Sequence, residues 1–187
     1  MNGSNGGGVR IHSFALVSYI PDPLAAFLDG LRNDLVSECH AKAHVTVLPP
    51  RPLTCPSGEA WTETQTRLQD FQPFLVELGE IEVFPVTDVI YVSVKAGSAE
   101  LRKLHAALNR GGVECAEPFL YHPHVTLAQD LQPGRVAAAE QIAARRWHDF
   151  RAARSFLVDE LTFVRSTVDN CWMDLQKWRL SSSVASR

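Results

Sequence analysis

The spacing of apolar residues predicts a fixed order of strands and helices in the first half of the chain. Apolar runs that alternate or are rich in β-branched residues predict strands at about 11–20, 44–48 and 74–84. Apolar residues at three- and four-residue intervals predict a helix over 24–35, and a thinner stripe predicts another over about 59–71. The predicted order is strand, helix, strand, helix, strand.

The second half of the chain repeats this order. Strands are predicted at about 89–95, 124–128 and 156–165. Helices are predicted between them, from Ser98 to the glycine pair at 111–112 and over about 133–147. The same five elements therefore occur twice, which indicates a duplicated half-domain and not an array of short repeats.

The whole chain, residues 1–187, is interpreted as one bilobal domain with pseudo-repeats at about 11–84 and 89–180. A final strand over 171–180, reached through a hairpin turn, ends the second repeat. Residues 1–9 are rich in glycine and asparagine and are expected to form a flexible tail. The predicted fold class is α+β: a duplicated bilobal fold with two antiparallel-dominated sheets, flanking helices and a central cleft.

Composition and charge narrow the class of protein. With 45% hydrophobic and 21% charged residues, the chain has the composition of an ordinary globular domain. The net charge of −3 argues against binding of a long nucleic-acid duplex, whereas a small nucleotide or an RNA end remains suitable. The four cysteines include no CxxC pair, and no apolar run approaches the roughly 20 residues that a membrane span needs. We expect a cytoplasmic monomer without a cofactor or a membrane partner.

One short motif occurs at the same place in both pseudo-repeats. Residues 44–47 read HVTV and residues 124–127 read HVTL, so the two histidines are 124 − 44 = 80 positions apart. In a strand, side chains two positions apart point to the same face, so each histidine neighbours its threonine while the intervening valine faces the core. Two related halves that face each other would bring both pairs to one cleft.

Two opposed imidazoles suit acid–base chemistry at a phosphodiester. Histidine is the side chain whose unperturbed pKa allows it to give or take a proton near neutrality. One imidazole can activate water while the other protonates the leaving oxygen, and threonine hydroxyls can contact the other oxygens of the phosphate. No metal is required in this scheme. The alternative is that His44 and His124 are structural strand histidines, and that Thr46 and Thr126 are there because threonine suits strands.

The paired motifs resemble those of the two-histidine phosphoesterase superfamily, which includes the 2′-5′ RNA ligase-like (LigT-like) proteins and the cyclic phosphodiesterases. Segment 121–128, YHPHVTLA, is similar to that family's aromatic-x-Pro-His-x-Thr-Leu signature, and segment 44–50, HVTVLPP, to its shorter HxTxLxP form. The resemblance covers nearly the whole chain through the order of its elements. It implies a bilobal α+β fold and metal-free attack on 2′,3′-cyclic or 2′-5′ phosphodiesters, with the two His/Thr pairs as the site.

By the same resemblance, His124 is the base and His44 the acid. Many ligase-like members carry a basic residue just after the second signature, where this chain has Gln129. This difference weakens the prediction of a long RNA substrate more than the prediction of phosphoesterase chemistry. Two other functions stay open. One is a binding module that holds a nucleotide or RNA end without turning it over, and the other is 2′-5′ RNA ligase activity from the same site.

Further residues are candidates for the site, and each has a structural alternative. Arg51 is a candidate phosphate contact or a solvated loop arginine, and Tyr121 is a candidate substrate-binding aromatic. His122 lies two positions before His124 and could share its face, so that the pair would form an HxH metal site. Cys39 and His40 are the only candidates for a third ligand, and their spacing is not convincing. The remaining candidates are stacking aromatics or core residues (Phe84, Phe163, Trp172), a basic patch or solvated face (Arg145, Arg146, Arg151, Arg154), and structural or surface histidines (His105, His148).

Overall fold

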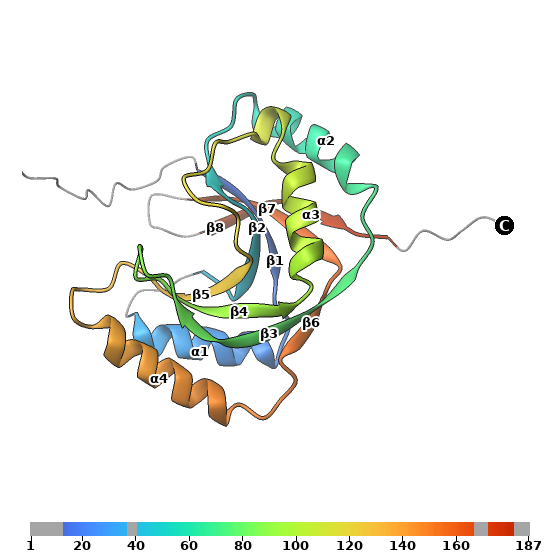
Figure 1. Cartoon of the computed structure of the whole chain (residues 1–187). Coiled ribbons are helices and arrows are strands. Elements are labelled where there is room, and N and C mark those ends of the chain that lie inside the picture. Colours follow the sequence, from blue (N-terminus) through green and yellow to red (C-terminus); the bar gives the residue numbers. More distant parts are fainter. Residues whose placement is uncertain (1–12, 37–40, 167–171, 182–187) are drawn as a thin grey trace, which may run out of the picture.

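The computed structural model describes residues 13–36, 41–166 and 172–181 (Figure 1). The predicted tail, Cys39 and His40, and most of the predicted final turn lie outside these residues. The described elements are, in chain order, β1 (Phe14–Tyr19), α1 (Leu24–Leu35), β2 (His44–Arg51), α2 (Ser57–Leu68), β3 (Phe74–Val83), β4 (Ile90–Ala96), α3 (Ser98–Leu108), the 3₁₀ turn η1 (Gly111–Val113), β5 (His124–Ala128), α4 (Val136–Asp149), β6 (Ser155–Val158), β7 (Glu160–Ser166) and β8 (Trp172–Arg179).

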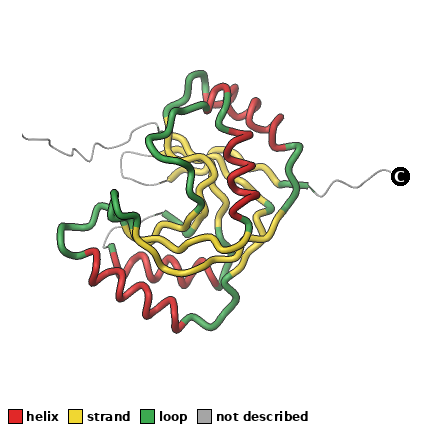
Figure 2. The backbone as a smooth tube through the Cα atoms, viewed as in Figure 1, coloured by secondary structure: helices red, strands yellow, loops and turns green. Residues whose placement is uncertain are grey.

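The strands form two four-stranded sheets in which every printed pairing is antiparallel. The first sheet has the order β2-β1-β7-β8 and the second has the order β5-β4-β3-β6. Helices α1 and α4 lie together against the second sheet, whereas α2 and α3 lie against the first (Figures 1 and 2). The predicted α+β fold with two antiparallel sheets and flanking helices is confirmed.

The chain crosses between the sheets at a point that the sequence prediction missed. The predicted single strand 156–165 is two strands, because β6 pairs with β3 in the second sheet and β7 pairs with β1 in the first. Residues Phe156 and Val158 are buried before the break, and Leu161 and Phe163 are buried after it. Burial alternates in β6, where Leu157 is exposed, whereas Leu161, Thr162, Phe163 and Val164 of β7 are all buried.

Helix α1 shows why the local predictions succeeded. Four leucines along one side of the helix are buried, at positions 24, 28, 31 and 35. The carboxylate of Asp22 accepts a hydrogen bond from the N–H of Ala26 at 3.0 Å, which satisfies a free donor at the start of the helix. Phe27 packs against Trp147 of α4, with ring centroids 5.9 Å apart. These contacts fix α1 to α4 across the outer face of the second sheet.

The edge strands β2 and β5 come into contact with each other, which joins the two sheets. Val45 and Val47 of β2 and Val125 and Leu127 of β5 are at most 1% exposed and belong to one core that runs through both lobes. The alternate residues of these strands therefore face away from the core. In the part of the chain that the structure describes, no helix combines the length and apolarity of a bilayer span.

Candidate active site

The two HxT motifs open β2 and β5 and have the same burial pattern. In each motif the histidine and the threonine are half-buried, and the apolar residue that follows each of them is buried. The contact between β2 and β5 brings the two motifs to the same region of the molecule. Burial lowers the pKa of His44, and the nearby His124 adds a smaller effect in the same direction. The structure thus brings together His44, Thr46, His124 and Thr126.

The two histidines are held in the same way by their own strands. Nδ1 of His44 lies 2.6 Å from the carbonyl oxygen of Lys42, and Nδ1 of His124 lies 2.6 Å from the carbonyl oxygen of His122. A carbonyl oxygen can only accept a hydrogen bond, so each Nδ1 carries a proton and donates. Each Nε2 is then the atom that remains to take up or release a proton. Both neutral imidazoles therefore have the same tautomer, with the proton on Nδ1 and none on Nε2.

The surroundings favour neutral imidazoles in the free protein. Burial lowers the pKa of His44 to about 4, and the nearby guanidinium of Arg32 contributes to this shift. Burial also lowers the pKa of His124, and the neighbouring His122 adds to the effect. The carbonyl contacts act in the opposite direction for both histidines but do not offset burial. At pH 7 both imidazoles are therefore neutral in the free protein.

We expect NMR titration to show this state directly. In the free protein, long-range ¹H–¹⁵N spectra at pH 7 should show Nδ1 protonated and Nε2 unprotonated for His44 and His124. The His44 signal should titrate near pH 4, and sulfate should move its midpoint upward because an anion stabilises the imidazolium. Signals are assigned by their loss in His44→Gln and His124→Gln. An Nε2–H tautomer for either residue would contradict the assigned geometry.

Aromatic side chains surround both histidines. The imidazole of His44 lies edge-on to Tyr19 at 6.4 Å and to Trp172 at 6.5 Å between ring centroids. The imidazole of His124 lies 5.0 Å from Phe84 and 5.3 Å from Tyr91. Of the predicted stacking residues, Phe84 and Trp172 therefore lie beside the histidines. Phe163 is a core residue, stacked on Trp61 and 2% exposed.

The sequence interpretation missed Tyr19 and Tyr91. Both belong to strands that pair with an HxT strand, and Tyr19 lies directly opposite His44 in the register. Each hydroxyl donates to a carboxylate, Tyr19 to Asp174 at 2.6 Å and Tyr91 to Glu82 at 2.9 Å. Burial and this hydrogen bond raise the pKa of Tyr91 to about 12, so it stays protonated. Periodicity placed both tyrosines in strands, but only the strand register shows that they face the histidines.

Arg51 is not at the site. Its side chain is buried, its guanidinium pairs with Glu117, and its Nη1 donates to Asn109 at 2.6 Å. The alternative of a solvated loop arginine is wrong, and each guanidinium nitrogen already donates within the fold, so the structure adds no support to the predicted phosphate contact. The reason lies in a contact between distant segments, because Glu117 lies 66 positions further along the chain. Arg51 instead fixes the segment before β5 to the end of β2.

Tyr121 lies beside the site but its polar atom is already engaged. Its hydroxyl donates to the carbonyl oxygen of Thr46 at 2.6 Å, and its ring stacks on His105 with centroids 4.0 Å apart. His105 in turn has Nδ1 2.8 Å from the carbonyl oxygen of Val47. Both side chains therefore hold the backbone of β2 in place. The contact between Tyr121 and Thr46 joins β2 to the segment just before β5, and the ring face against His105 is not open to a substrate.

The remaining candidates are the predicted metal site and the residues on or near α4. His122 is exposed and packs edge-on against Phe84 at 5.4 Å. Within residues 13–36, 41–166 and 172–181, no group of three or more His, Cys, Asp or Glu side chains is arranged to hold a metal ion. His148 is exposed on α4. Of the basic residues near it, Arg146 pairs with Asp34 and Arg154 stacks over Trp147 at 4.4 Å.

Comparison with known proteins identifies several that are similar to this chain in sequence or in fold. A candidate phosphoesterase from Oceanobacillus iheyensis is 30% identical over 76 residues, which are 40% of this chain and 44% of that protein. The matched segment thus spans less than half of the relative's length. E. coli LigT complexed with 3′-AMP aligns with 16% identity and a TM-score of 0.64 over 91% of this chain and 99% of that one. Kluyveromyces marxianus Usb1 aligns with 15% identity and a TM-score of 0.50 over 89% and 98%.

The similar structures show the fold, and a match to a family model shows the family. The model described as the 2′-5′ RNA ligase superfamily matches residues 20–170, a segment that contains both HxT motifs and both edge strands that carry them. The chain therefore belongs to the 2′-5′ RNA ligase superfamily of two-histidine phosphoesterases.

Proposed function

We propose that this protein hydrolyses a phosphodiester, a 2′,3′-cyclic phosphate of a nucleotide or RNA end or a 2′-5′ linkage, by acid–base catalysis between His44 and His124. The observation that carries the proposal is the shared geometry of the two histidines. Each Nδ1 is engaged by a carbonyl oxygen two residues earlier, which leaves each Nε2 as the atom for proton transfer. Membership of a phosphoesterase superfamily supports the reaction class.

In the proposed reaction, His124 takes a proton from water as the water oxygen attacks phosphorus. The bond from phosphorus to a ribose oxygen breaks, and protonated His44 gives its proton to that oxygen. The hydroxyl groups of Thr46 and Thr126 contact the nonbridging oxygens, where negative charge develops. The product from a 2′,3′-cyclic phosphate is a nucleoside monophosphate. His124 ends protonated and His44 neutral, and exchange with solvent restores the starting state.

The lowered pKa values fit this scheme when the substrate is an anion. In the free protein both imidazoles are neutral at pH 7, so the acid form is rare. A phosphodiester carries negative charge, and its position between two imidazoles raises the pKa of each. Substrate binding is then coupled to uptake of one proton. The protein would thus form the required pair, one protonated and one neutral imidazole, chiefly when an anionic substrate is bound.

A small nucleotide is the substrate class that we favour. The chain has a net charge of −3 and Gln129 is exposed just after the second motif, so neither supplies a basic track for a long RNA. The LigT structures are described as complexes with 3′-AMP and with NADP⁺, which are small nucleotides. We extend that class of ligand to this protein as part of the proposal. A nucleoside 2′,3′-cyclic phosphate is the simplest substrate of this kind.

The test is turnover of defined phosphodiesters in EDTA. The four nucleoside 2′,3′-cyclic monophosphates and a 2′-5′-linked dinucleotide are incubated with the protein, and products are identified by phosphorus NMR. We expect hydrolysis of at least one substrate, with all product as one positional isomer. Tight binding without product would contradict hydrolysis and favour a binding module. Joining of RNA ends with a 2′,3′-cyclic phosphate, without hydrolysis, would favour ligation.

The assignment of acid and base predicts a leaving-group effect. A p-nitrophenyl phosphodiester releases a stable phenolate, which needs no protonation, so loss of the acid should matter little. His44→Ala should therefore retain much more of its activity on this ester than on a cyclic nucleotide, whereas His124→Ala should lose activity on both. The expected contrast is roughly 10²-fold or more, the size of one acid–base contribution. The opposite pattern would exchange the two roles.

A further inference from the structure

An arginine binds a carbonyl oxygen just before each HxT strand. Nη1 of Arg32, on α1, donates to the carbonyl oxygen of Ala41 at 2.6 Å. Nη1 of Arg102, on α3, donates to the carbonyl oxygen of Tyr121, also at 2.6 Å. Each of these carbonyls lies three positions before the histidine of its HxT motif. The helix before each HxT strand thus holds the chain one residue ahead of the carbonyl that contacts Nδ1 of that histidine.

The two arginines differ in burial. Arg32 is 6% exposed, whereas Arg102 lies on the exposed side of α3. Water screens the charge of an exposed guanidinium, but a buried charge acts over several ångströms. Burial is the main cause that lowers the pKa of His44, and the charge of Arg32 adds to it. The two backbone contacts are alike, but the contact beside His44 also brings a buried positive charge.

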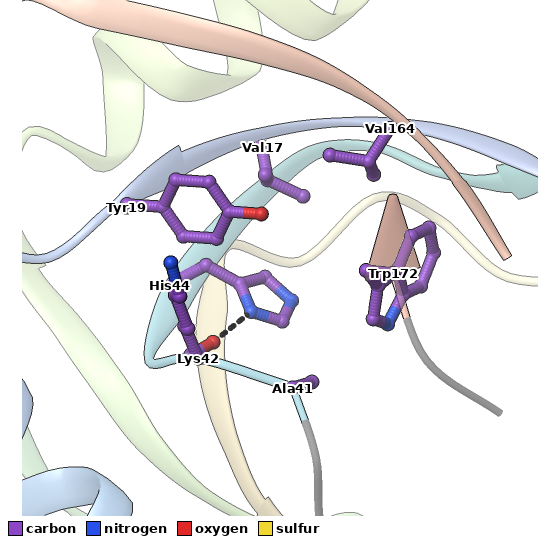
Figure 3. Close-up of a pocket in the computed structure, with 7 residues that line it drawn as sticks. All are labelled: Val17, Tyr19, Ala41, Lys42, His44, Val164 and Trp172. Carbon is purple, nitrogen blue, oxygen red and sulfur yellow. Dashed lines mark hydrogen bonds between the residues drawn. The ribbon is translucent and has the colours of Figure 1, made fainter. Parts of the chain in front are cut away.

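A second side chain of α1 holds the 41–43 segment. The carboxylate of Asp29 accepts a hydrogen bond from the backbone N–H of Ala43. Its Oδ1 lies 3.7 Å from Nη1 of Arg32, which is too far for a hydrogen bond, and its side chain is 37% exposed. Within the described part of the chain, Nε of Arg32 has no hydrogen-bond partner. Helix α1 therefore grips the segment on both sides of Lys42, whose carbonyl oxygen contacts Nδ1 of the HxT histidine (Figure 3).

The other titratable groups around His44 do not supply a buried charge. Tyr19 of β1 donates to Asp174 of β8, and burial raises the pKa of Tyr19, so its hydroxyl is neutral. Asp174 is exposed, and so is Lys42, whose ammonium lies 5.7 Å from the ring of Tyr19. His124 of β5 is neutral in the free protein. Among the described residues, the buried cation beside His44 is therefore the guanidinium on α1.

We propose that Arg32 is a positioning residue that acts through His44: it holds the segment whose carbonyl orients the imidazole, and it places a buried positive charge beside that imidazole. The inference rests on the proposed function, in which His44 is the acid. A positive charge beside an imidazolium favours release of its proton, so His44 is a stronger acid than it would be alone. The fixed carbonyl keeps Nδ1 engaged and leaves Nε2 as the atom that gives the proton.

The first test is NMR titration of the free protein, which needs no turnover. Arg32→Met should raise the midpoint of His44 by roughly 0.5 to 1.5 pH units, because the opposing charge is lost. The midpoint of His124 should move much less. At pH 7, His44 should show an Nε2–H tautomer beside the Nδ1–H form, because the carbonyl that holds Nδ1 is no longer fixed. Circular dichroism checks that the variant folds.

Three further variants control this test. Arg32→Met leaves the carboxylate of Asp29 without its partner, so Asp29→Asn/Arg32→Met is titrated as well, in which no charge is left alone. It should raise the midpoint of His44 to the same extent. Arg32→Lys keeps the charge and should keep that midpoint close to the wild type. Arg102→Met should leave the midpoints of both HxT histidines unchanged, because the charge it removes is exposed. A folded double variant whose His44 keeps the wild-type midpoint and a single tautomer would overturn the proposal.

Kinetics distinguish positioning of the acid from a purely structural role. Arg32→Met should lower kcat for a cyclic nucleotide by roughly 3- to 30-fold with little change in KM, which is less than the loss of the acid itself. Turnover of a p-nitrophenyl phosphodiester, which needs no acid, should be unchanged. Equal losses on the two substrates would overturn the inference. If the midpoint of His44 moves as expected but no phosphodiester is turned over, the link from Arg32 to His44 stands and the proposed hydrolysis falls.

Discussion

Alanine at either histidine should nearly abolish turnover in EDTA. His44→Ala removes the proposed acid and His124→Ala removes the proposed base, and each such contribution is worth roughly 10²–10⁴-fold in kcat. The two residues act as one unit on one phosphorus, so the double variant should be little worse than the weaker single variant. The measurement is kcat and KM for the best 2′,3′-cyclic nucleotide, with folding of each variant checked by circular dichroism.

The matched control is His148→Ala, which removes an exposed imidazole on α4. It should leave kcat and KM unchanged. His122→Ala is a closer control, because His122 neighbours His124 and lowers its pKa. Its loss should shift the pH dependence without removing activity. Full activity in either His44→Ala or His124→Ala would rule out the paired mechanism.

Removal of the buried charge of Arg51 should destabilise the fold more than removal of a charge at the surface. The guanidinium is buried and bound by Glu117, Asn109 and two backbone carbonyls. Arg51→Met leaves the carboxylate of Glu117, which is 15% exposed, without its main partner. Loss of one member of a buried ion pair typically costs about 3–5 kcal/mol in the free energy of unfolding. Urea denaturation should show this as a lower midpoint with an unchanged slope.

The control for this prediction is Lys177→Met, which breaks an exposed pair with Glu160 in the first sheet. Surface pairs of this kind contribute little, so its midpoint should stay close to that of the wild type. The double variant Arg51→Met/Glu117→Gln should lose less stability than the two single variants combined, because neither charge is then left alone. A midpoint for Arg51→Met equal to that of Lys177→Met would show that the buried pair is not a stabilising feature.

Local pattern and a repeated motif were sufficient for much of this structure. The period of two in the HxT strands placed His44 with Thr46 and His124 with Thr126 on one face, opposite the buried valines. The leucine spacing of α1 likewise predicted its buried side, since helix formation depends on near neighbours. The domain boundaries and the roles of the site residues remain proposals.

What the sequence could not show depends on contacts between distant segments. The burial of Arg51 requires Glu117, whose proximity no local pattern encodes. The position of Tyr19 opposite His44 follows from strand register, which is set by the fold. The division of 156–165 into two strands could not be predicted, because the run as a whole is apolar enough to read as one strand. These misses concern how segments meet and not which elements form.

The central claim is that two histidines exchange protons with the substrate, and the pH dependence of turnover tests it most directly. One imidazole must be protonated and the other neutral, so kcat/KM should follow a bell whose limbs report the free protein. Burial lowers both pKa values below the usual 6.5, to about 4 for His44. The optimum of kcat/KM should therefore lie below pH 6.5, and kcat/KM should decrease as the pH rises above the optimum. The bound anion raises both values, so the kcat optimum should lie at higher pH than that of kcat/KM. A kcat/KM that is flat from pH 5 to 9 would contradict the mechanism.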